Sequence, residues 1–317
     1  MKYYVTISLL YTLLIIITPL LSNAQTDMDA IMMEKKQLCI GPMYSHSSWK
    51  NYWEGTLKRD NQNLGTISTA AFALMGAYGI TGKLNFLFNA PFIKTTASAG
   101  TLHGMQGFQD LSLYLKWMPV EKQLGPGTFS LYTIGGVSFP LTNYVADFLP
   151  LSIGLHSKTA SVRLMLDYQV SNIFATGSAT YVLRDNIKID RTSYYDTQLH
   201  LSNEVSMPNV SNLNFRAGYR STKLIAEAVV NKWTTLGGFD ITRNNMPFPS
   251  NKMNATTIGA NFKYVITANH NLLLVGGGNS TVAGRNVGQV TTFYGSVFYV
   301  LDFTHKMKSV NQPVKTN

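Results

Sequence analysis

Long runs of strictly alternating residues constrain the fold of this chain more than any other feature. Apolar side chains occupy every second position, with small or polar ones between them, in five stretches: 108–118, 160–171, 212–221, 256–267 and 289–303. A period of two places the apolar side chains on one face of a β-strand. Each run has about ten residues or more, which exceeds the usual strand of a soluble sheet and matches a tilted strand that spans a bilayer.

The charge content is too low for an ordinary soluble enzyme of this length. The chain has 317 residues, of which 13% are charged, 45% hydrophobic and 12% aromatic, and its formal net charge is +10. Soluble domains carry about a quarter charged residues, and this composition also excludes a disordered or collagen-like protein. Beyond the N-terminus no run of 18 apolar residues occurs, so we expect no transmembrane helix. Composition and alternation together predict a β-barrel in an outer membrane.

The connections between the alternating runs favour an antiparallel up-and-down transmembrane barrel of twelve strands. Outer-membrane barrels have short turns on the periplasmic side and longer loops outside. With a first strand near 38–46, we expect long connections at 47–65, 95–107, 140–159, 187–210 and 236–253, short ones at 79–83, 171–173, 221–223 and 268–271, and intermediate ones at 119–127 and 284–288. Two more strands within 187–210 would make fourteen, but that segment lacks a clean pair of alternating runs. A soluble sandwich or a lipocalin-like barrel is the alternative fold.

Four segments are expected along the chain. The first, 1–24, has an early cation, an apolar run and small residues up to Ala24, features that are typical of a cleaved secretory signal peptide. After it we expect a short periplasmic segment at 25–37, the barrel at 38–303 and a periplasmic tail at 304–317. The single cysteine, Cys39, excludes an internal disulfide.

A twelve-stranded barrel has a narrow lumen, so its inward side chains decide what passes. The polar positions that the alternation places on the inner face include Asp110, Tyr114, Lys116, Arg163, Asp167, Arg216, Glu227, Asn231, Asn261 and Lys263. Arg216, Glu227 and Lys263 fall on three consecutive strands and can form a cross-strand ionic ladder. Two interpretations stay open: the ladder braces the wall, or it forms a constriction that favours anions.

Two of the expected outer loops are rich in large apolar side chains. One contains Tyr144, Phe148 and Leu151, and the other contains Phe239 and Phe248. An exposed apolar patch usually marks a binding site or an interface. These residues therefore predict either an extracellular mouth that captures hydrophobic ligands or loops that fold inward and plug the barrel.

Two motifs resemble a known family. They are residues 77–85, with the sequence AYGITGKLN and a following Pro91-Phe92, and residues 107–113, with the sequence GFQDLSL. They resemble the outer-membrane family named for the meta-pathway of phenol degradation, whose members are relatives of the long-chain fatty-acid transporters. The similarity covers roughly 66–118 and departs at Gly82, where the family usually has Asp, and at Gln109, where it has Gly.

The resemblance implies passive uptake of apolar, often aromatic, compounds across an outer membrane. The fatty-acid transporters fill their lumen with an N-terminal hatch, whereas here only the residues from Gln25 to Gln37 precede the first strand. We expect so short a segment to be unable to form the same plug, and therefore expect no hatch-opening mechanism.

Features of other function classes are weak. His46 and Ser48 would share one face of a strand, as a Ser-His pair of a hydrolase requires, but no nearby Asp or Asn would orient the imidazole. We therefore expect no enzyme. The other histidines lack metal-ligand spacing and no glycine-rich phosphate loop opens a helix, so no metal or other cofactor is expected. The cations are dispersed, which does not fit a nucleic-acid partner.

The sequence thus predicts an outer-membrane channel of a Gram-negative bacterium that admits small hydrophobic or aromatic compounds by diffusion. A structural or surface-interaction barrel with a plugged lumen is the alternative, and a general porin is a third. The expected partners are outer-membrane lipid and lipopolysaccharide, small apolar solutes, and the barrel-assembly machinery that inserts such proteins.

Overall fold

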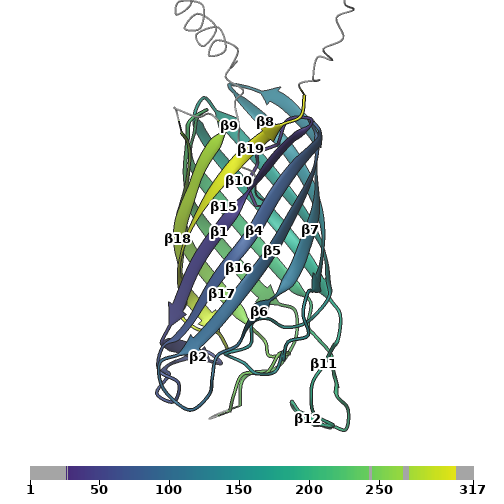
Figure 1. The fold of residues 1–317 in the computed structure, drawn as a ribbon, viewed down its shortest axis with the longest axis vertical. Coiled ribbons are helices and arrows are strands. Elements are labelled where there is room, and N and C mark those ends of the chain that lie inside the picture. The colour runs from purple at the N-terminus through teal and green to yellow at the C-terminus, as the bar shows by residue number, and fades with distance from the viewer. Residues whose placement is uncertain (1–25, 27, 243–244, 267–270, 305–317) are drawn as a thin grey trace, which may run out of the picture.

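The chain forms a closed antiparallel barrel of twelve long strands (Figure 1). The computed structural model describes residues 26, 28–242, 245–266 and 271–304. The barrel strands, each of 11 to 15 residues, are β1 (Gln37–Trp49), β4 (Ile67–Thr81), β5 (Leu84–Ala97), β7 (Asp110–Leu124), β8 (Gly127–Pro140), β9 (Thr159–Val170), β10 (Ile173–Arg184), β15 (Val210–Arg220), β16 (Leu224–Thr235), β17 (Asn254–Val265), β18 (Leu272–Arg285) and β19 (Thr291–Asp302). The predicted fold class and the number of barrel strands are confirmed.

The first and last strands close the barrel. β1 pairs with β4 on one side and with β19 on the other, where Gln37 lies opposite Asp302. Turns of two or three residues join β4 to β5, β7 to β8, β9 to β10 and β15 to β16, and they lie at the same end as Gln37 (Figure 1). We call this end the turn end and the opposite end, which carries the long connections, the loop end.

Short strands lie outside the twelve. In the connection at 187–210, β11 (Ile187–Lys188) pairs with β14 (Glu204–Val205) and β12 (Tyr194–Tyr195) with β13 (Leu199–His200), so these strands do not enter the barrel wall. β2 (Asn51–Glu54) and β3 (Leu57–Asp60) form another hairpin at the loop end, and β6 (Gln106–Phe108) extends the sheet beside β5. The fourteen-strand alternative is therefore wrong for this chain.

The expected connection at 119–127 is wrong. β7 continues to Leu124, and only Gly125 and Pro126 separate it from β8. The error has a physical cause: Glu121 to Gln123 are polar and exposed because the strand extends past the apolar band, and polar residues in that position resemble a loop.

The outer face of the barrel is apolar, as the alternation predicts. In β9 the outward Leu164 and Leu166 are 56% and 50% exposed, whereas Met165 between them is completely buried. A soluble sandwich or barrel would cover such a face, so the exposed apolar band is typical of a transmembrane barrel. No helix in the described part of the chain is long and apolar enough to cross a membrane.

A charge placed on the outer face tests the membrane orientation. We expect Leu164→Arg to destabilise the folded barrel in vesicles by about 2–4 kcal/mol, the cost of Arg near the bilayer midplane. Leu201→Arg is the control, because Leu201 is 85% exposed in a connection at the loop end and should tolerate the charge. Urea titration in phosphatidylcholine vesicles measures both variants, and equal stability of the two would contradict a lipid-facing position for Leu164.

Candidate functional site

The structure places all ten predicted lumen residues on the inner face of the barrel. Six of them are buried, with Lys116 completely inaccessible. The buried ones are Lys116, Arg163, Asp167, Arg216, Glu227 and Lys263, and the partly buried ones are Asp110, Tyr114, Asn231 and Asn261. They do not line an open tube, because the chain ahead of β1 lies among them.

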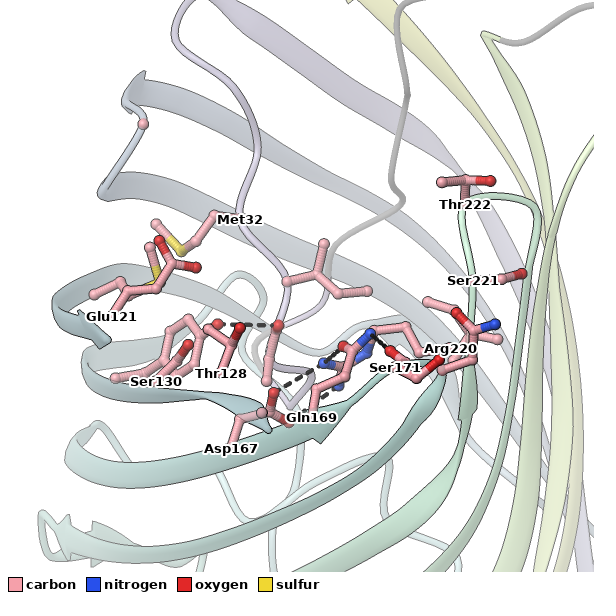
Figure 2. A pocket seen from close by; sticks show the side chains of 18 of the residues that line it. Met32, Glu121, Thr128, Ser130, Asp167, Gln169, Ser171, Arg220, Ser221 and Thr222 are labelled. Carbon is pink, nitrogen blue, oxygen red and sulfur yellow. Dashed lines mark hydrogen bonds and ion pairs between the residues drawn. The ribbon is translucent and has the colours of Figure 1, made fainter. Parts of the chain in front are cut away.

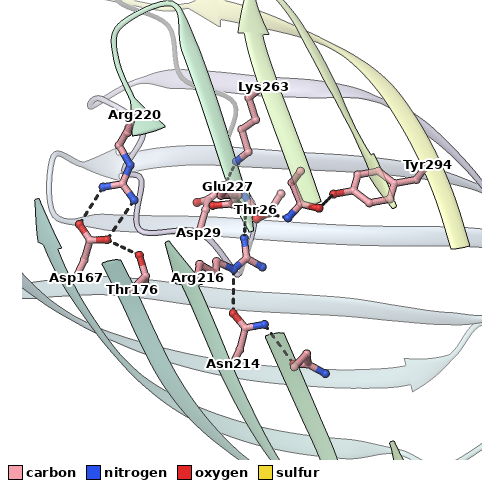
Figure 3. Close-up of polar contacts among 12 residues, drawn as sticks. Thr26, Asp29, Asp167, Thr176, Asn214, Arg216, Arg220, Glu227, Lys263 and Tyr294 are labelled. Atoms are coloured by element: carbon pink, nitrogen blue, oxygen red, sulfur yellow. Dashed lines mark hydrogen bonds and ion pairs between the residues drawn. The ribbon is translucent and has the colours of Figure 1, made fainter. Parts of the chain in front are cut away.

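The N-terminal segment, residues 28–36, crosses the lumen near the turn end. Its Asp29 is 3% exposed and forms ion pairs with two lysines. Lys116 Nζ on β7 lies 3.1 Å from Asp29 Oδ1. Lys263 Nζ on β17 contacts Asp29 Oδ2, as Figure 3 shows. Because β7 and β17 are six strands apart in the closed ring of twelve, these lysines reach Asp29 from opposite walls.

The rest of the segment packs against the wall on several sides. The Tyr132 hydroxyl on β8 donates a hydrogen bond of 3.1 Å to the carbonyl of Ala30, and Ile31 packs against Phe174 and Ile225. Close to β1, the backbone amide of Lys36 donates to the Gly79 carbonyl at 2.7 Å. The segment that we expected in the periplasm therefore has residues inside the lumen, because an extended chain needs few residues to span a narrow barrel.

A cavity of about 760 Å³ opens on the turn-end side of the N-terminal segment (Figure 2). Met32 of the segment and Tyr132 of the wall line it. Arg220 pairs with Asp167 at 2.9 Å and lies over the Phe174 ring, 3.9 Å from its centroid. The charges of Arg220 and Asp167 in this cavity therefore neutralise each other, and the carboxylates of Glu34 and Glu121 also line it.

The predicted ionic ladder exists in part. Arg216 Nη1 donates to Glu227 Oε1 at 2.8 Å, and Asn261 donates to the same oxygen at 2.8 Å (Figure 3). Lys263, the expected third member, forms its ion pair with Asp29 of the N-terminal segment. The prediction missed this partner because it considered only strand neighbours.

At the loop end, the predicted mouth residues are not freely exposed. Tyr144 and Leu151 are 8% and 0% exposed, and Phe148 packs beside Leu151. The Tyr144 hydroxyl donates to Asp110 at 2.6 Å, and the Thr95 hydroxyl on the inner wall donates to the Leu151 carbonyl at 2.6 Å. Burial and the hydrogen bond to Asp110 raise the pKa of Tyr144 above its usual range, so its hydroxyl remains a donor.

The connection between β8 and β9 therefore lies against the inner wall, as the alternative of inward-folded loops predicts. Phe239 and Phe248, in the connection between β16 and β17, are half-buried. Phe248 stacks on Tyr194 with ring centroids 5.5 Å apart, and both line a loop-end pocket of about 180 Å³. Phe239 lines the same pocket.

The His46–Ser48 pair and the metal-ligating residue types do not form a site in the described residues. His46 and Ser48 lie on the outward face of β1, away from the cavities of the lumen. Among the residues that the structure describes, no group of three or more His, Cys, Asp or Glu side chains could hold a metal ion.

Sequence reasoning missed Asp29 and Tyr132, two residues that hold the N-terminal segment in the lumen. One signal was present in the sequence. Residues 28–33, MDAIMM, are mostly apolar with a single acid, whereas a segment in water between a signal peptide and a barrel is expected to be polar.

Removing the charge of Asp29 should loosen the N-terminal segment. Asp29→Asn leaves two buried lysines without their carboxylate. Removal of one partner from a buried ion pair lowers the stability of a protein by roughly 3–5 kcal/mol. We expect a severalfold higher ion conductance in planar bilayers. Asp60→Asn is the control, because Asp60 pairs with Lys50 at the surface, where both side chains are largely exposed. Unchanged conductance of a folded Asp29→Asn barrel would contradict the role of this ion pair.

A methyl group at Gly79 should displace the same segment. A Cβ on Gly79 would collide with the carbonyl of Glu34, whereas a Cβ on Gly82 would meet open space. We expect Gly79→Ala to accelerate cleavage at Lys35 and Lys36 by a lysine-specific protease, and Gly82→Ala to leave the rate unchanged. Equal rates in the two variants would show that the segment does not rest on Gly79.

Comparison with known proteins agrees with this architecture. Residues 58–295 match the model of the family described as "Putative MetA-pathway of phenol degradation". The structure is similar to that of the COG4313 outer membrane channel from Pseudomonas putida F1, with 13% identity, a TM-score of 0.68, and coverage of 88% of this chain and 100% of that one.

Two further solved structures are less similar. The transport unit of the autotransporter AIDA-I from Escherichia coli has 12% identity and a TM-score of 0.44, covering 87% of this chain and 93% of that one. A Pseudomonas aeruginosa FadL homologue has 9% identity and a TM-score of 0.35, covering 84% and 90%. No protein with a curated description matches the sequence. Because the family model spans most of the barrel, this chain belongs to the family of the phenol-degradation meta-pathway.

Proposed function

We propose that this protein is an outer-membrane channel for the passive uptake of small hydrophobic or aromatic solutes. The observation that carries the proposal is the aromatic pocket at the loop end of a closed barrel whose lumen holds further cavities. Membership of the family and the fold shared with an outer membrane channel support it. In this proposal the loop end faces the exterior and the turn end the periplasm.

The loop-end pocket suits a single ring. Its volume of about 180 Å³ is below the 300–1,000 Å³ usual for drug-sized ligands. Tyr194 and Phe248 stack with an interplanar angle of 22°, and Phe239 lies 6.2 Å from Phe248 between ring centroids. Aromatic faces of this kind attract a planar apolar solute by burial and by offset stacking. The pocket would raise the local concentration of such a solute at the mouth.

Export and insertion complete the proposal. Residues 1–24 would be removed as a signal peptide, and the barrel-assembly machinery would insert the chain beside lipopolysaccharide. The signal-peptide residues and most of the proposed periplasmic tail, 305–317, lie outside the described residues.

A second candidate function is a structural barrel that transports nothing. The observation in its favour is the filling of the lumen by the N-terminal segment and of the loop end by the inward-folded connection between β8 and β9. A general porin fits less well, because its lumen would have to admit water-soluble solutes without regard to chemistry.

Uptake into proteoliposomes separates these functions. The probes are radiolabelled benzoate, kept ionised at pH 7 and corrected for leak through protein-free vesicles, and a sugar of similar size. Faster entry of benzoate alone supports the proposal, entry of both at similar rates indicates a porin, and entry of neither indicates a structural barrel.

Variants locate the capture site in the same assay. Loss of one aromatic stacking contact is equivalent to roughly 0.5–1.5 kcal/mol, or about a two- to tenfold change. We therefore expect Tyr194→Ala and Phe248→Ala to lower the benzoate uptake at low concentration by this factor. Leu201→Ala, at an exposed position that does not line the pocket, is the control. Equal uptake in all variants would exclude the pocket from the path.

A further inference from the structure

A second lumen cavity has a chemistry that the aromatic pocket lacks. It has a volume of about 240 Å³ and lies on the loop-end side of the N-terminal segment, whose Met28 contributes to its lining. Five asparagines from four neighbouring strands line it: Asn212 and Asn214 of β15, Asn231 of β16, Asn261 of β17 and Asn279 of β18. Carboxamides thus cover one continuous part of the inner wall.

The charged side chain that lines this cavity, Arg216, is paired with the carboxylate of Glu227. Arg216 donates to Glu227 at 2.8 Å and to the Asn214 oxygen at 2.9 Å. The Asn261 amide donates to the same Glu227 oxygen, and the Tyr294 hydroxyl donates to the Asn261 oxygen at 2.5 Å. A guanidinium and a carboxylate in direct contact leave the cavity without a strong preference for an anion or a cation.

Other carboxamide groups of the cavity remain available. The Asn212 side-chain oxygen has no hydrogen-bond partner within the described residues, but neighbouring atoms cover it, so a solute bonds to it only after the side chain rotates. The Asn279 side chain makes no hydrogen bond within the described residues. The Asn231 side chain uses only its oxygen, which accepts a hydrogen bond of 3.2 Å from the Asn214 amide. A carboxamide has two donor hydrogens and an acceptor oxygen, so the wall offers both kinds of group to a ligand.

We infer that this cavity is a binding site for uncharged, ring-sized solutes that carry several hydroxyl groups, such as a cyclitol or a monosaccharide. A hydroxyl both donates and accepts, which matches the free groups of Asn212, Asn231 and Asn279. An apolar ring would leave these groups without partners, and burial of unpaired polar groups disfavours binding. A charged solute would have to compete with the bond between Arg216 and Glu227.

The size of the cavity fits one such ring. At the roughly 30 Å³ that each molecule takes in the liquid, 240 Å³ holds about eight waters, which a hydroxylated six-membered ring can replace. The site lies on the loop-end side of the N-terminal segment, so binding from that side requires no movement of the segment. The inference goes beyond the proposed function, because it concerns a different cavity and a different class of solute.

Equilibrium dialysis of the detergent-solubilised full-length barrel against radiolabelled myo-inositol tests the inference. We expect saturable binding of one inositol per barrel. Asn212→Leu with Asn279→Leu should weaken it at least tenfold, because leucine keeps the size of the side chain and removes the hydrogen-bonding groups. Asn63→Leu, at an exposed position at the loop end, should leave the affinity unchanged. Unlabelled cyclohexanol, with one hydroxyl on a ring of the same size, should not compete.

Absence of saturable inositol binding by the unaltered protein would overturn the inference, as would equal affinity in the double variant and the Asn63→Leu control. If the double variant does not fold, as judged by its heat-modifiable electrophoretic mobility, the single variants Asn212→Ala and Asn279→Ala give the same comparison. Benzoate uptake into proteoliposomes is measured separately, so failure of the aromatic channel and failure of this site are distinguishable.

Discussion

The carboxylate of Asp29 is the group on which the interior of this barrel depends. Lys116 and Lys263 project into the lumen from opposite walls, and Asp29 contacts both. A buried charge without a partner costs several kcal/mol, so two buried lysines in a narrow lumen require a nearby acid. Asp29 comes from outside the barrel strands, and its position fixes the segment that carries it across the lumen.

The segment divides the space inside the barrel. Met28 lines the asparagine-rich cavity on the loop-end side, and Ala30 to Met32 line the larger cavity on the turn-end side. Twelve strands enclose a lumen too narrow for a folded plug domain but wide enough for one extended chain. A few extended residues therefore occupy the lumen at this level.

The barrel could be predicted from the sequence because the alternation that defines each strand is a pattern between residues close together in the chain. Alternation assigns each strand residue to a face, and residues such as Arg163 and Asp167 on the inner side of β9 follow directly from it. The contacts of Asp29 could not be predicted in this way, because its partners are 87 and 234 residues away and alternation carries no information across the lumen. The direction of the loops was also ambiguous: apolar residues such as Leu151 fit an exposed mouth and a buried contact equally well.

In the proposed channel, passage through the lumen is coupled to release of the N-terminal segment. Residues 28–32 line both cavities, and they include the carboxylate that holds the lysines. If release of Asp29 costs about 3–5 kcal/mol, as for other broken buried ion pairs, the released state has a population on the order of 10⁻³. Salt screens buried pairs weakly, so this population depends little on ionic strength. A solute that binds the released state more tightly than the attached state increases the population of the released state. The size of this increase is limited by the difference between its affinities for the two states. Selectivity in such a channel therefore requires solute contacts that form when the segment leaves the wall, in addition to contacts at the loop end.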